Sequence, residues 1–183
     1  MTVESILTSI ESERRWVDDC MRSFQSDLTI DISPCVFQVP KSFAETKPQA
    51  YTPQKISLGP YHHLRPEFFT TQRHKLTVAK NFLNNDHQVQ HFAEEVLDKL
   101  WLVEPLIRAY YDKYLDLEGK TLVWILAIDS LYLLNFLNSY NTQDDQEVDD
   151  SNSNSHERRK LAQDVMMLEN QIPSFVLIEI STL

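Results

Sequence analysis

Residues 56–63 read Ile56-Ser57-Leu58-Gly59-Pro60-Tyr61-His62-His63. This stretch places one of the chain's 2 glycines in a tight turn beside a proline, among polar aromatic side chains. More prolines precede it, and because proline fixes φ and lacks an N–H donor, no long helix can cross this part of the chain. Two short β-like runs, residues 35–39 and 55–58, lie between these prolines and predict a small two-strand pairing.

Helices are predicted on both sides of this Pro-rich insert, because apolar residues recur there at helical spacing. The predicted ranges are 3–28, 66–84, 88–116, 121–139, 156–170 and 174–180. Pro105 predicts a kink near residues 101–104, and Gly119 is interpreted as a cap that ends the third helix. The helix at 121–139 is apolar on nearly every face and is expected at the centre. The predicted fold class is mainly α: a helical globular domain with a short Pro-rich insert that contains the β-like runs.

The length of 183 residues and the apolar share of 42% fit a single globular domain over residues 1–183. Residues 141–155 are acidic and rich in Ser and Asn, which predicts a flexible acidic loop. The formal net charge of −10 opposes contact with phosphate backbones, so no nucleic-acid partner is expected.

The chain by itself is expected to be soluble and cytoplasmic. Its N-terminus has no basic segment followed by an apolar run, so no secretory signal is predicted. The longest apolar stretch, residues 122–137, contains Asp129 and is interpreted as too short and too polar to span a membrane. Cys20 and Cys35 are interpreted as reduced, mostly buried thiols, with a bridge between them as the alternative.

Several spaced motifs resemble the plant family built on domain of unknown function 247. Tyr51-Thr52-Pro53 precedes residues 56–62, and His74-Lys75 follows on the next helix. A last block runs from Asp164 to Pro173. The resemblance extends from about Val36 to Ile180. It implies structural motif roles for Gly59, Pro60, Tyr61, His62, His74, Lys75, Asp129, Asp164, Glu169, Asn170, Gln171 and Pro173.

The resemblance also implies a mostly helical plant protein from a family without an established enzyme activity. Some relatives are associated with recognition between pollen and stigma. Family members commonly carry Met-Glu before the His-Lys pair, where this chain has Gln72-Arg73. Full-length members are typically more than twice as long and often end in one membrane-spanning helix. The chain therefore resembles the N-terminal half of the family only, and we expect it to be truncated.

Asp129 is the leading single candidate for a special role, because it lies within an otherwise apolar helix. A buried, unpaired carboxylate would cost several kcal/mol, so Asp129 must be paired, hydrogen-bonded or protonated. One interpretation is a catalytic acid or base with a raised pKa. The other is a structural anchor, bound to Lys75, to His74 or to the turn at residues 59–63.

Glu169, Asn170 and Gln171 precede a proline at the end of a predicted helix. Their side chains carry many donors and acceptors, so they can satisfy the free carbonyls of that helix end and of a neighbouring loop. A catalytic role for Glu169 is the alternative.

Cofactor and metal sites have little support in the sequence. Phosphate-binding loops need clustered glycines, and Gly59 and Gly119 are far apart, so no nucleotide cofactor is expected. His87 and His91 stand one helical turn apart, as two metal ligands on one helix face would, but the zinc-protease motif needs a glutamate where Gln88 stands. His62, His63 and His74 could supply further ligands, but no metal site is predicted, and His87 and His91 are the candidates named for one.

Three function hypotheses follow. The first is a non-enzymatic interaction or recognition module, with an unidentified protein partner or self-association through residues 174–183. The second is a hydrolase-like or metal-dependent enzyme that uses Asp129, Glu169 and His62 or His74. The third is a non-functional gene fragment. Because residues 174–183 are apolar and follow the break at Pro173, we expect an exposed apolar patch there.

Overall fold

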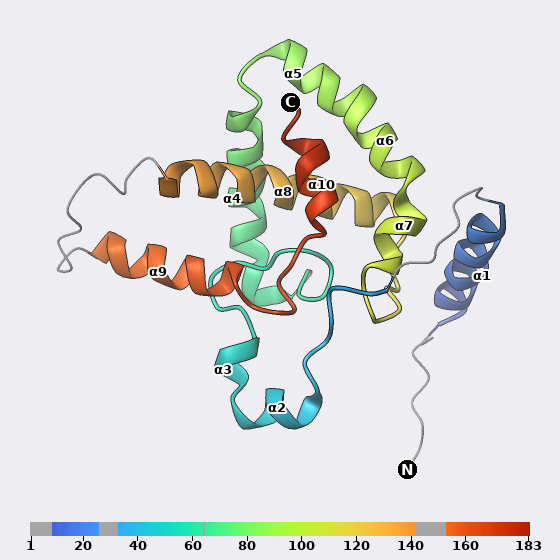
Figure 1. The fold of residues 1–183 in the computed structure, drawn as a ribbon, viewed down its shortest axis with the longest axis horizontal. Coiled ribbons are helices and arrows are strands. Elements are labelled where there is room, and N and C mark those ends of the chain that lie inside the picture. Colours follow the sequence, from blue (N-terminus) through green and yellow to red (C-terminus); the bar gives the residue numbers. More distant parts are fainter. Residues whose placement is uncertain (1–8, 26–32, 64, 142–152) are drawn as a thin grey trace.

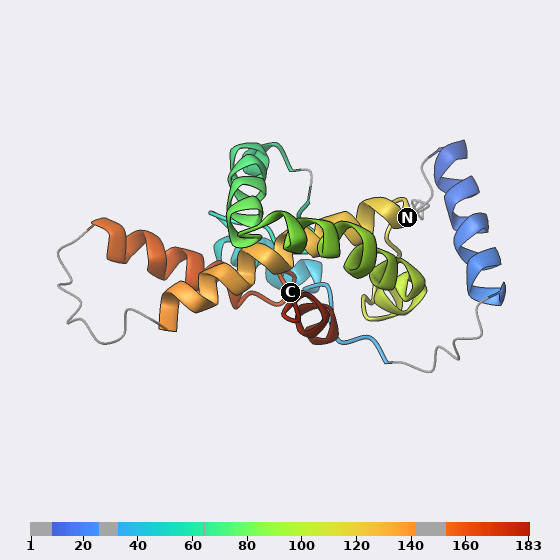
Figure 2. The same ribbon diagram turned by 90° about the horizontal axis from the view of Figure 1, so that it is seen from above.

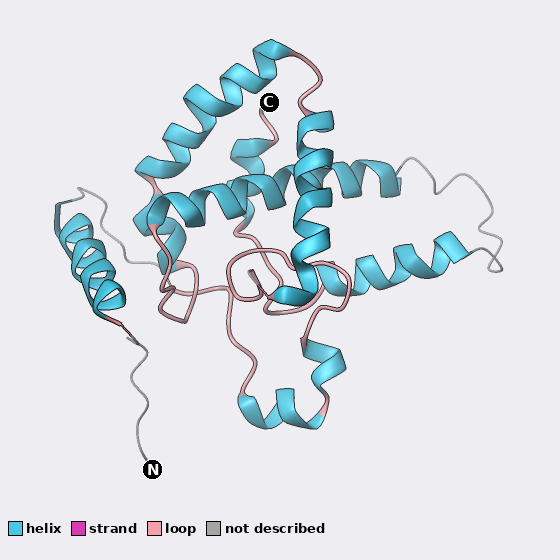
Figure 3. Cartoon of the chain, turned by 180° about the vertical axis from the view of Figure 1, so that it is seen from behind, coloured by secondary structure: helices cyan, strands magenta, loops and turns pink. Residues whose placement is uncertain are grey.

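The computed structural model describes residues 9–25, 33–63, 65–141 and 153–183. These residues are mainly helical, and none of them forms a strand (Figure 3). The helices are α1 (Ile10–Gln25), α2 (Lys41–Thr46), α3 (Pro48–Tyr51), the 3-10 turn η1 (Pro66–Phe68), α4 (Phe69–Phe82), α5 (Asp86–His91), the π-helical turn η2 (Phe92–Val96), α6 (Leu97–Leu102), α7 (Glu104–Ala109), α8 (Gly119–Asn141), α9 (Ser153–Val165) and α10 (Ser174–Ile180).

Helix α8 is the centre of the fold. Helix α4 crosses it on one side and α10 packs on the other, as Figures 1 and 2 show together. The side chains of Leu122, Leu126 and Leu131 on α8 are fully buried, so the apolar character of this helix is used inside the fold. This central position is the one that the sequence predicts for residues 121–139.

The stretch Gly119–Ser139 of α8 is long and apolar enough to cross a membrane by length and composition. The expectation that it is too short is therefore wrong, because the helix begins before Leu122. In the structure 56% of an apolar 18-residue window of this stretch is buried inside the protein, and α8 packs against α4, α6 and α10. The length and apolar composition of this stretch are thus accounted for by its position as a core helix of this fold.

The helical region from α5 to α7 is divided by two local irregularities. The π-helical turn at Phe92–Val96 separates α5 from α6, and Val103 separates α6 from α7. Pro105 lies in the first turn of α7, where its missing N–H costs nothing, so the predicted kink near residues 101–104 is present as a break. The chain leaves the helix after Ala109, earlier than the predicted end at residue 116.

The predicted pairing of residues 35–39 with 55–58 is wrong. Val36 instead forms an isolated parallel bridge with Tyr111, in which Val36 N–H donates to the Tyr110 carbonyl and Asp112 N–H donates to the Val36 carbonyl. The backbone of residues 54–58 is bound by side chains from residues 164–170 rather than by a strand.

Other predicted boundaries also change. Gly119 is the first residue of α8 and does not cap the preceding helix. The helix predicted at 156–170 spans Ser153–Val165, and Asn141 still belongs to α8, while residues 142–152 of the predicted acidic loop lie outside the described residues. Cys20 and Cys35 are both free thiols, but Cys35 is exposed and Cys20 is partly exposed, so neither is buried as predicted.

Candidate functional site

A cluster of buried polar side chains surrounds residues 54–62, the segment that contains Gly59. Asp164, at the end of α9, binds this segment through its carboxylate. It accepts hydrogen bonds from the backbone N–H groups of Gln54, Lys55 and Ile56, at 3.0, 2.5 and 2.9 Å to Oδ2. One carboxylate thus satisfies three consecutive donors that would otherwise need a neighbouring strand.

Asn170 continues the same pattern two residues further along the segment. Its Oδ1 accepts from Leu58 N–H at 2.5 Å, and its Nδ2 donates to the Ile56 carbonyl at 3.0 Å. A carboxamide offers the same donor and acceptor as a peptide group, so Asn170 occupies the place of one residue of a paired strand. Its Nδ2 also donates to the Asp164 carbonyl, at 2.8 Å, which fixes the turn after α9.

Gln171 satisfies the free end of α9. Its Nε2 donates to the carbonyls of Val165 and Met167, at 2.8 and 2.7 Å. The Val165 carbonyl belongs to the last turn of α9, where a helix leaves acceptors without a backbone partner, and the Met167 carbonyl in the following turn also accepts from Asn170 N–H. Pro173 then stands at the N-cap position of α10, so the block from Asp164 to Pro173 both ends one helix and begins the next.

Asp129 of α8 lies on the other side of the same segment. Its Oδ1 accepts from Lys75 Nζ of α4 at 2.5 Å, and its Oδ2 accepts from Gly59 N–H at 2.9 Å. Lys75 Nζ also donates to the Ser57 carbonyl, at 2.5 Å. Burial raises the pKa of the Asp129 carboxyl, whereas the Lys75 ammonium and the Gly59 N–H oppose that rise. This ion pair therefore joins α4, α8 and the Gly59 turn.

His62 and Glu169 form a separate contact at the edge of the cluster. Glu169 Oε1 accepts from Val39 N–H at 2.7 Å, and Oε2 lies 3.1 Å from His62 Nε2, outside hydrogen-bond geometry. Burial and the Arg65 guanidinium lower the pKa of His62, while Glu169 opposes that change. His74 is exposed and packs its ring edge against Tyr132, so it joins neither this contact nor Asp129.

Tyr61 and Tyr111 connect the Gly59 turn to the bridge at Val36. Tyr61 Oη donates to Asp112 Oδ1 at 2.6 Å, and its ring packs edge-on against Tyr111 with centroids 5.4 Å apart. Tyr111 Oη in turn reaches the Gln171 carbonyl at 3.3 Å. The motif residue Tyr61 is therefore a packing and hydrogen-bonding link between segments that are distant in the sequence.

His63 gives the cluster a predicted pH dependence. Burial and the nearby Lys75 ammonium lower the pKa of His63 to about 4. In the unfolded chain the ring binds a proton near its ordinary pKa of about 6.5, so acid favours unfolding between these two values. Above about pH 6.5 His63 should not lower the free energy of unfolding. As the pH falls toward 4, protonation of its ring in the unfolded chain should lower that free energy by about 1–2 kcal/mol, a value reduced to allow for the partial exposure of the ring.

Urea unfolding at several pH values between 7.5 and 4 measures this effect. His63→Gln removes the titrating group, so its curve of stability against pH should be flatter than that of the parent protein over this range. Equal slopes for the two proteins would contradict the assignment. His62 has a lowered pKa as well, so the variant is expected to keep part of the slope.

The metal-ligand candidates do not gather into a site. The His87 and His91 rings stack with centroids 6.5 Å apart, and His91 Nδ1 lies 3.2 Å from Glu95 Oε2. Among the described residues there is no group of three or more His, Cys, Asp or Glu side chains that could hold a metal ion.

A second polar cluster, which is not predicted from the sequence, attaches α1 to α7 and to the segment that precedes α8. Arg15 pairs with Asp116 at 2.8 Å, Arg22 pairs with Glu104 at 3.2 Å, and Ser12 donates to Asp116 at 2.5 Å. Arg108 lies 3.5 Å from Asp19, and the Arg22 guanidinium stacks 5.3 Å from the Trp101 ring centroid. In the sequence, the one signal for this contact face of α1 is the i, i+3 and i+7 spacing of Ser12, Arg15 and Asp19.

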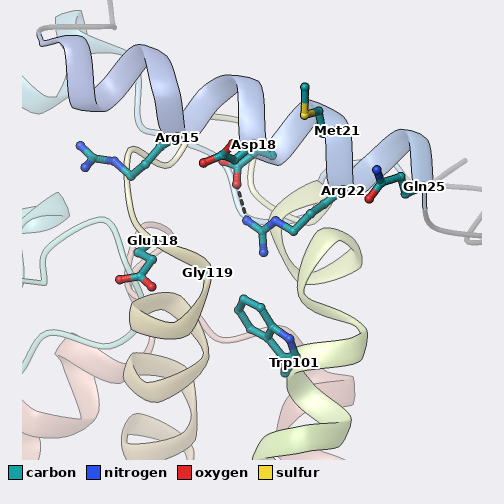
Figure 4. Close-up of a pocket in the computed structure, with 9 residues that line it drawn as sticks. Arg15, Asp18, Met21, Arg22, Gln25, Trp101, Glu118 and Gly119 are labelled. Carbon is teal, nitrogen blue, oxygen red and sulfur yellow. Dashed lines mark hydrogen bonds and ion pairs between the residues drawn. The ribbon is translucent and has the colours of Figure 1, made fainter.

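A pocket of about 380 Å³ lies between α1 and the main body (Figure 4). Its walls include Arg15, Asp19, Arg22, Trp101, Glu118 and Gly119. Figure 4 shows Arg15 and Arg22 projecting from α1 toward the body of the protein, whereas Met21 points to the opposite side of the helix. The lining carries charges of both signs, and Arg22 donates to Asp19 within it, so no cluster of a single charge marks the pocket as an anion or a cation site.

Comparison with known proteins identifies similar chains in plants. A family model described as plant protein of unknown function, DUF247, matches residues 36–183. The putative UPF0481 protein At3g02645 of Arabidopsis thaliana is 36% identical over 169 residues, which cover 90% of this chain and 31% of that protein. The UPF0481 protein At3g47200 of the same plant is 31% identical over 146 residues, or 79% of this chain and 30% of its own length. The chain thus spans less than a third of each relative. No solved structure gives a significant match.

Proposed function

The chain belongs to the DUF247 family of plant proteins, and we propose that it acts as a non-enzymatic interaction or recognition module. The observation that carries this proposal is the burial of the motif residues. Asp129, Asp164 and Asn170 are at most 2% exposed, and each is engaged with backbone or with Lys75. A catalytic group must contact its substrate, whereas these side chains contact the protein itself.

The motif residues therefore hold the fold together. A partner protein would be recognised by other residues, which lie on the surface. For the enzyme hypothesis, His62 and Glu169 are in contact, but Asp129 pairs with Lys75 instead of joining them. His74 stands apart on the exposed side of α4. These contacts support a structural role for Asp129, His62 and Glu169.

The surface that we propose for recognition or self-association is residues 174–183. Helix α10 packs on α8 through Val176 and Ile180, which are fully buried, while Ile178 is 65% exposed. The exposed apolar area is smaller than the sequence predicts, because Phe175 and Leu177 are partly covered by the core. What supports an interface here is the combination of an exposed Ile178 with partly covered apolar neighbours on the same short helix.

Ile178→Asp tests this face without removing the core residues of α10. We expect the parent protein to self-associate in sedimentation velocity as its concentration rises, and the variant to remain monomeric with the same helical content. A charge at the centre of an apolar contact must be desolvated, so the association constant should fall by about tenfold or more.

Phe69→Asp is the matched control, because Phe69 is 71% exposed on α4. It should leave the association unchanged. If the parent protein and Ile178→Asp are equally monomeric, and a hydrophobic dye binds neither, residues 174–183 do not form an interface.

A further inference from the structure

Helix α1 is attached to the protein by its polar face and turns its apolar face to solvent. The residues that contact the body, Ser12, Arg15, Asp19 and Arg22, are all polar. On the opposite side Ile10, Val17, Met21 and Phe24 are 68, 42, 56 and 92% exposed. An amphipathic helix of a globular protein ordinarily does the reverse, so this orientation calls for an explanation.

The ion pairs fix the rotation of α1 about its own axis. Arg15 binds Asp116 and Arg22 binds Glu104, so two contacts two helical turns apart hold the same face against the body. Glu104 is 1% exposed, and Asp116 also accepts a hydrogen bond from Ser12. If α1 were rotated by half a turn about its axis, both acids would face apolar side chains instead of their partners. The outward position of the apolar side chains is therefore specified by the charges.

The outward side chains follow the repeat of a coiled coil. Ile10, Arg14, Val17, Met21 and Phe24 are separated by four, three, four and three residues, which is the spacing of the two core positions of a heptad. In the sequence the same alternation continues at Val3, Leu7 and Leu28, which lie outside the described residues. Arg14 is the single polar residue in this series, and we call the series the α1 stripe.

The charges beside the α1 stripe indicate what kind of helix would fit it. Glu11 and Asp18 flank one edge and Glu13 flanks the other, and all three are exposed. In a parallel pair of identical chains Glu13 would face Asp18 of the second copy, and Arg14 would face Arg14. In an antiparallel pair Glu11 would face Asp18. Both arrangements place like charges together, and the net charge of −10 adds to that repulsion.

We propose that the α1 stripe docks an amphipathic helix of a partner protein, with an apolar seam flanked by Lys and Arg and with an acidic residue opposite Arg14. Apolar side chains of the seam would cover Ile10, Val17, Met21 and Phe24, while the basic flanks pair with Glu11, Glu13 and Asp18. The same acidic edges disfavour an anionic lipid surface. This surface is distinct from residues 174–183 and does not depend on them.

A pair of synthetic peptides tests the charge preference directly. Both have leucine at the two core positions of four heptads and glutamate at the position that would face Arg14. One carries lysine and the other glutamate at the flanking positions. Titration of the full chain into each labelled peptide, followed by fluorescence anisotropy, should give binding of the lysine peptide that is at least about tenfold tighter, because several flanking pairs change sign.

Two variants connect the binding to the α1 stripe. Val17→Glu should abolish binding of the lysine peptide without loss of helical content, because Val17 is already 42% exposed. The double variant Glu11→Lys with Asp18→Lys should reverse the preference in favour of the glutamate peptide. Ile178→Asp should bind the lysine peptide as the parent protein does, which separates this proposal from the one for residues 174–183.

Three results would overturn the proposal. The first is that neither peptide binds, or that Val17→Glu binds as the parent protein does. The second is self-association that Val17→Glu abolishes, which would make a second copy the occupant of the α1 stripe. The third is sedimentation of the chain with vesicles of phosphatidylcholine and phosphatidylserine, lost in Val17→Glu, which would make a lipid surface the occupant.

Discussion

Asp129→Ala is expected to lower the free energy of unfolding by about 3–5 kcal/mol, because it leaves the Lys75 ammonium buried without its partner. Lys75 is 0% exposed and Asp129 is 1% exposed, so water cannot replace the lost contact. The variant also removes the acceptor of the Gly59 N–H. Because a domain of this size is stable by only about 5–15 kcal/mol in total, this single change should be visible in any denaturation experiment.

The double variant Asp129→Leu with Lys75→Met separates the charge from the space that it fills. Both replacements are apolar and of similar volume, so we expect the double variant to recover most of the loss, as buried ion pairs replaced by apolar residues commonly do. Asp129→Leu and Lys75→Met alone should both be severely destabilising. Urea unfolding of the four proteins gives the coupling energy of the pair. A loss below about 1 kcal/mol in Asp129→Ala would show that Asp129 does not anchor the core.

Gly59→Ala is expected to cost about 2–4 kcal/mol for two independent reasons. Gly59 has φ of +67°, a left-handed conformation that side chains with a Cβ rarely adopt. A Cβ on Gly59 would also lie 2.7 Å from the Gln171 carbonyl oxygen, a backbone atom that cannot move away without shifting the turn before α10. The melting temperature or the urea midpoint measures the loss.

Gly119→Ala is the matched comparison, because Gly119 is the other glycine of the chain. A Cβ there would lie 2.7 Å from Arg22 Nη1, which is the end of a flexible side chain, and 2.8 Å from the Trp101 ring. We expect a smaller loss of stability, since Gly119 begins a helix and alanine favours helix formation. Equal losses in the two variants would mean that the left-handed turn at Gly59 carries no special strain.

The sequence predicts the helices of this fold far better than it predicts the contacts between them. Residues 66–84, 121–139 and 174–180 are helical close to the predicted ranges, and Pro105 marks a real break, because periodicity and proline act locally. The pairing of residues 35–39 with 55–58 was wrong for the opposite reason. Asp164 and Asn170 replace the missing strand from a sequence separation of 108–114 residues, and no local pattern reports such a contact.

The same distinction applies to the candidate sites. An acid within an apolar helix predicts a buried partner for Asp129. The sequence alone leaves Lys75, His74 and the turn at residues 59–63 open as that partner, and the structure shows Lys75 and the Gly59 N–H. The orientation of α1 could not be predicted, because amphipathicity gives two faces without saying which one is buried. That choice depends on Glu104, Arg108 and Asp116, which come from another part of the chain.

The hydrogen bonds from the backbone of residues 54–58 to Asp164 and Asn170 set an order of events during synthesis on the ribosome. Residues 54–58 are translated more than a hundred residues before the side chains that bind them, which at roughly 5–20 residues per second is a delay of about five seconds or more. Throughout that time the N–H groups of Ile56 and Leu58 have no native acceptor, although part of the core around their side chains has already been translated. The backbone of residues 54–58 therefore cannot complete its native hydrogen bonds until α9 and the residues after it have left the ribosome.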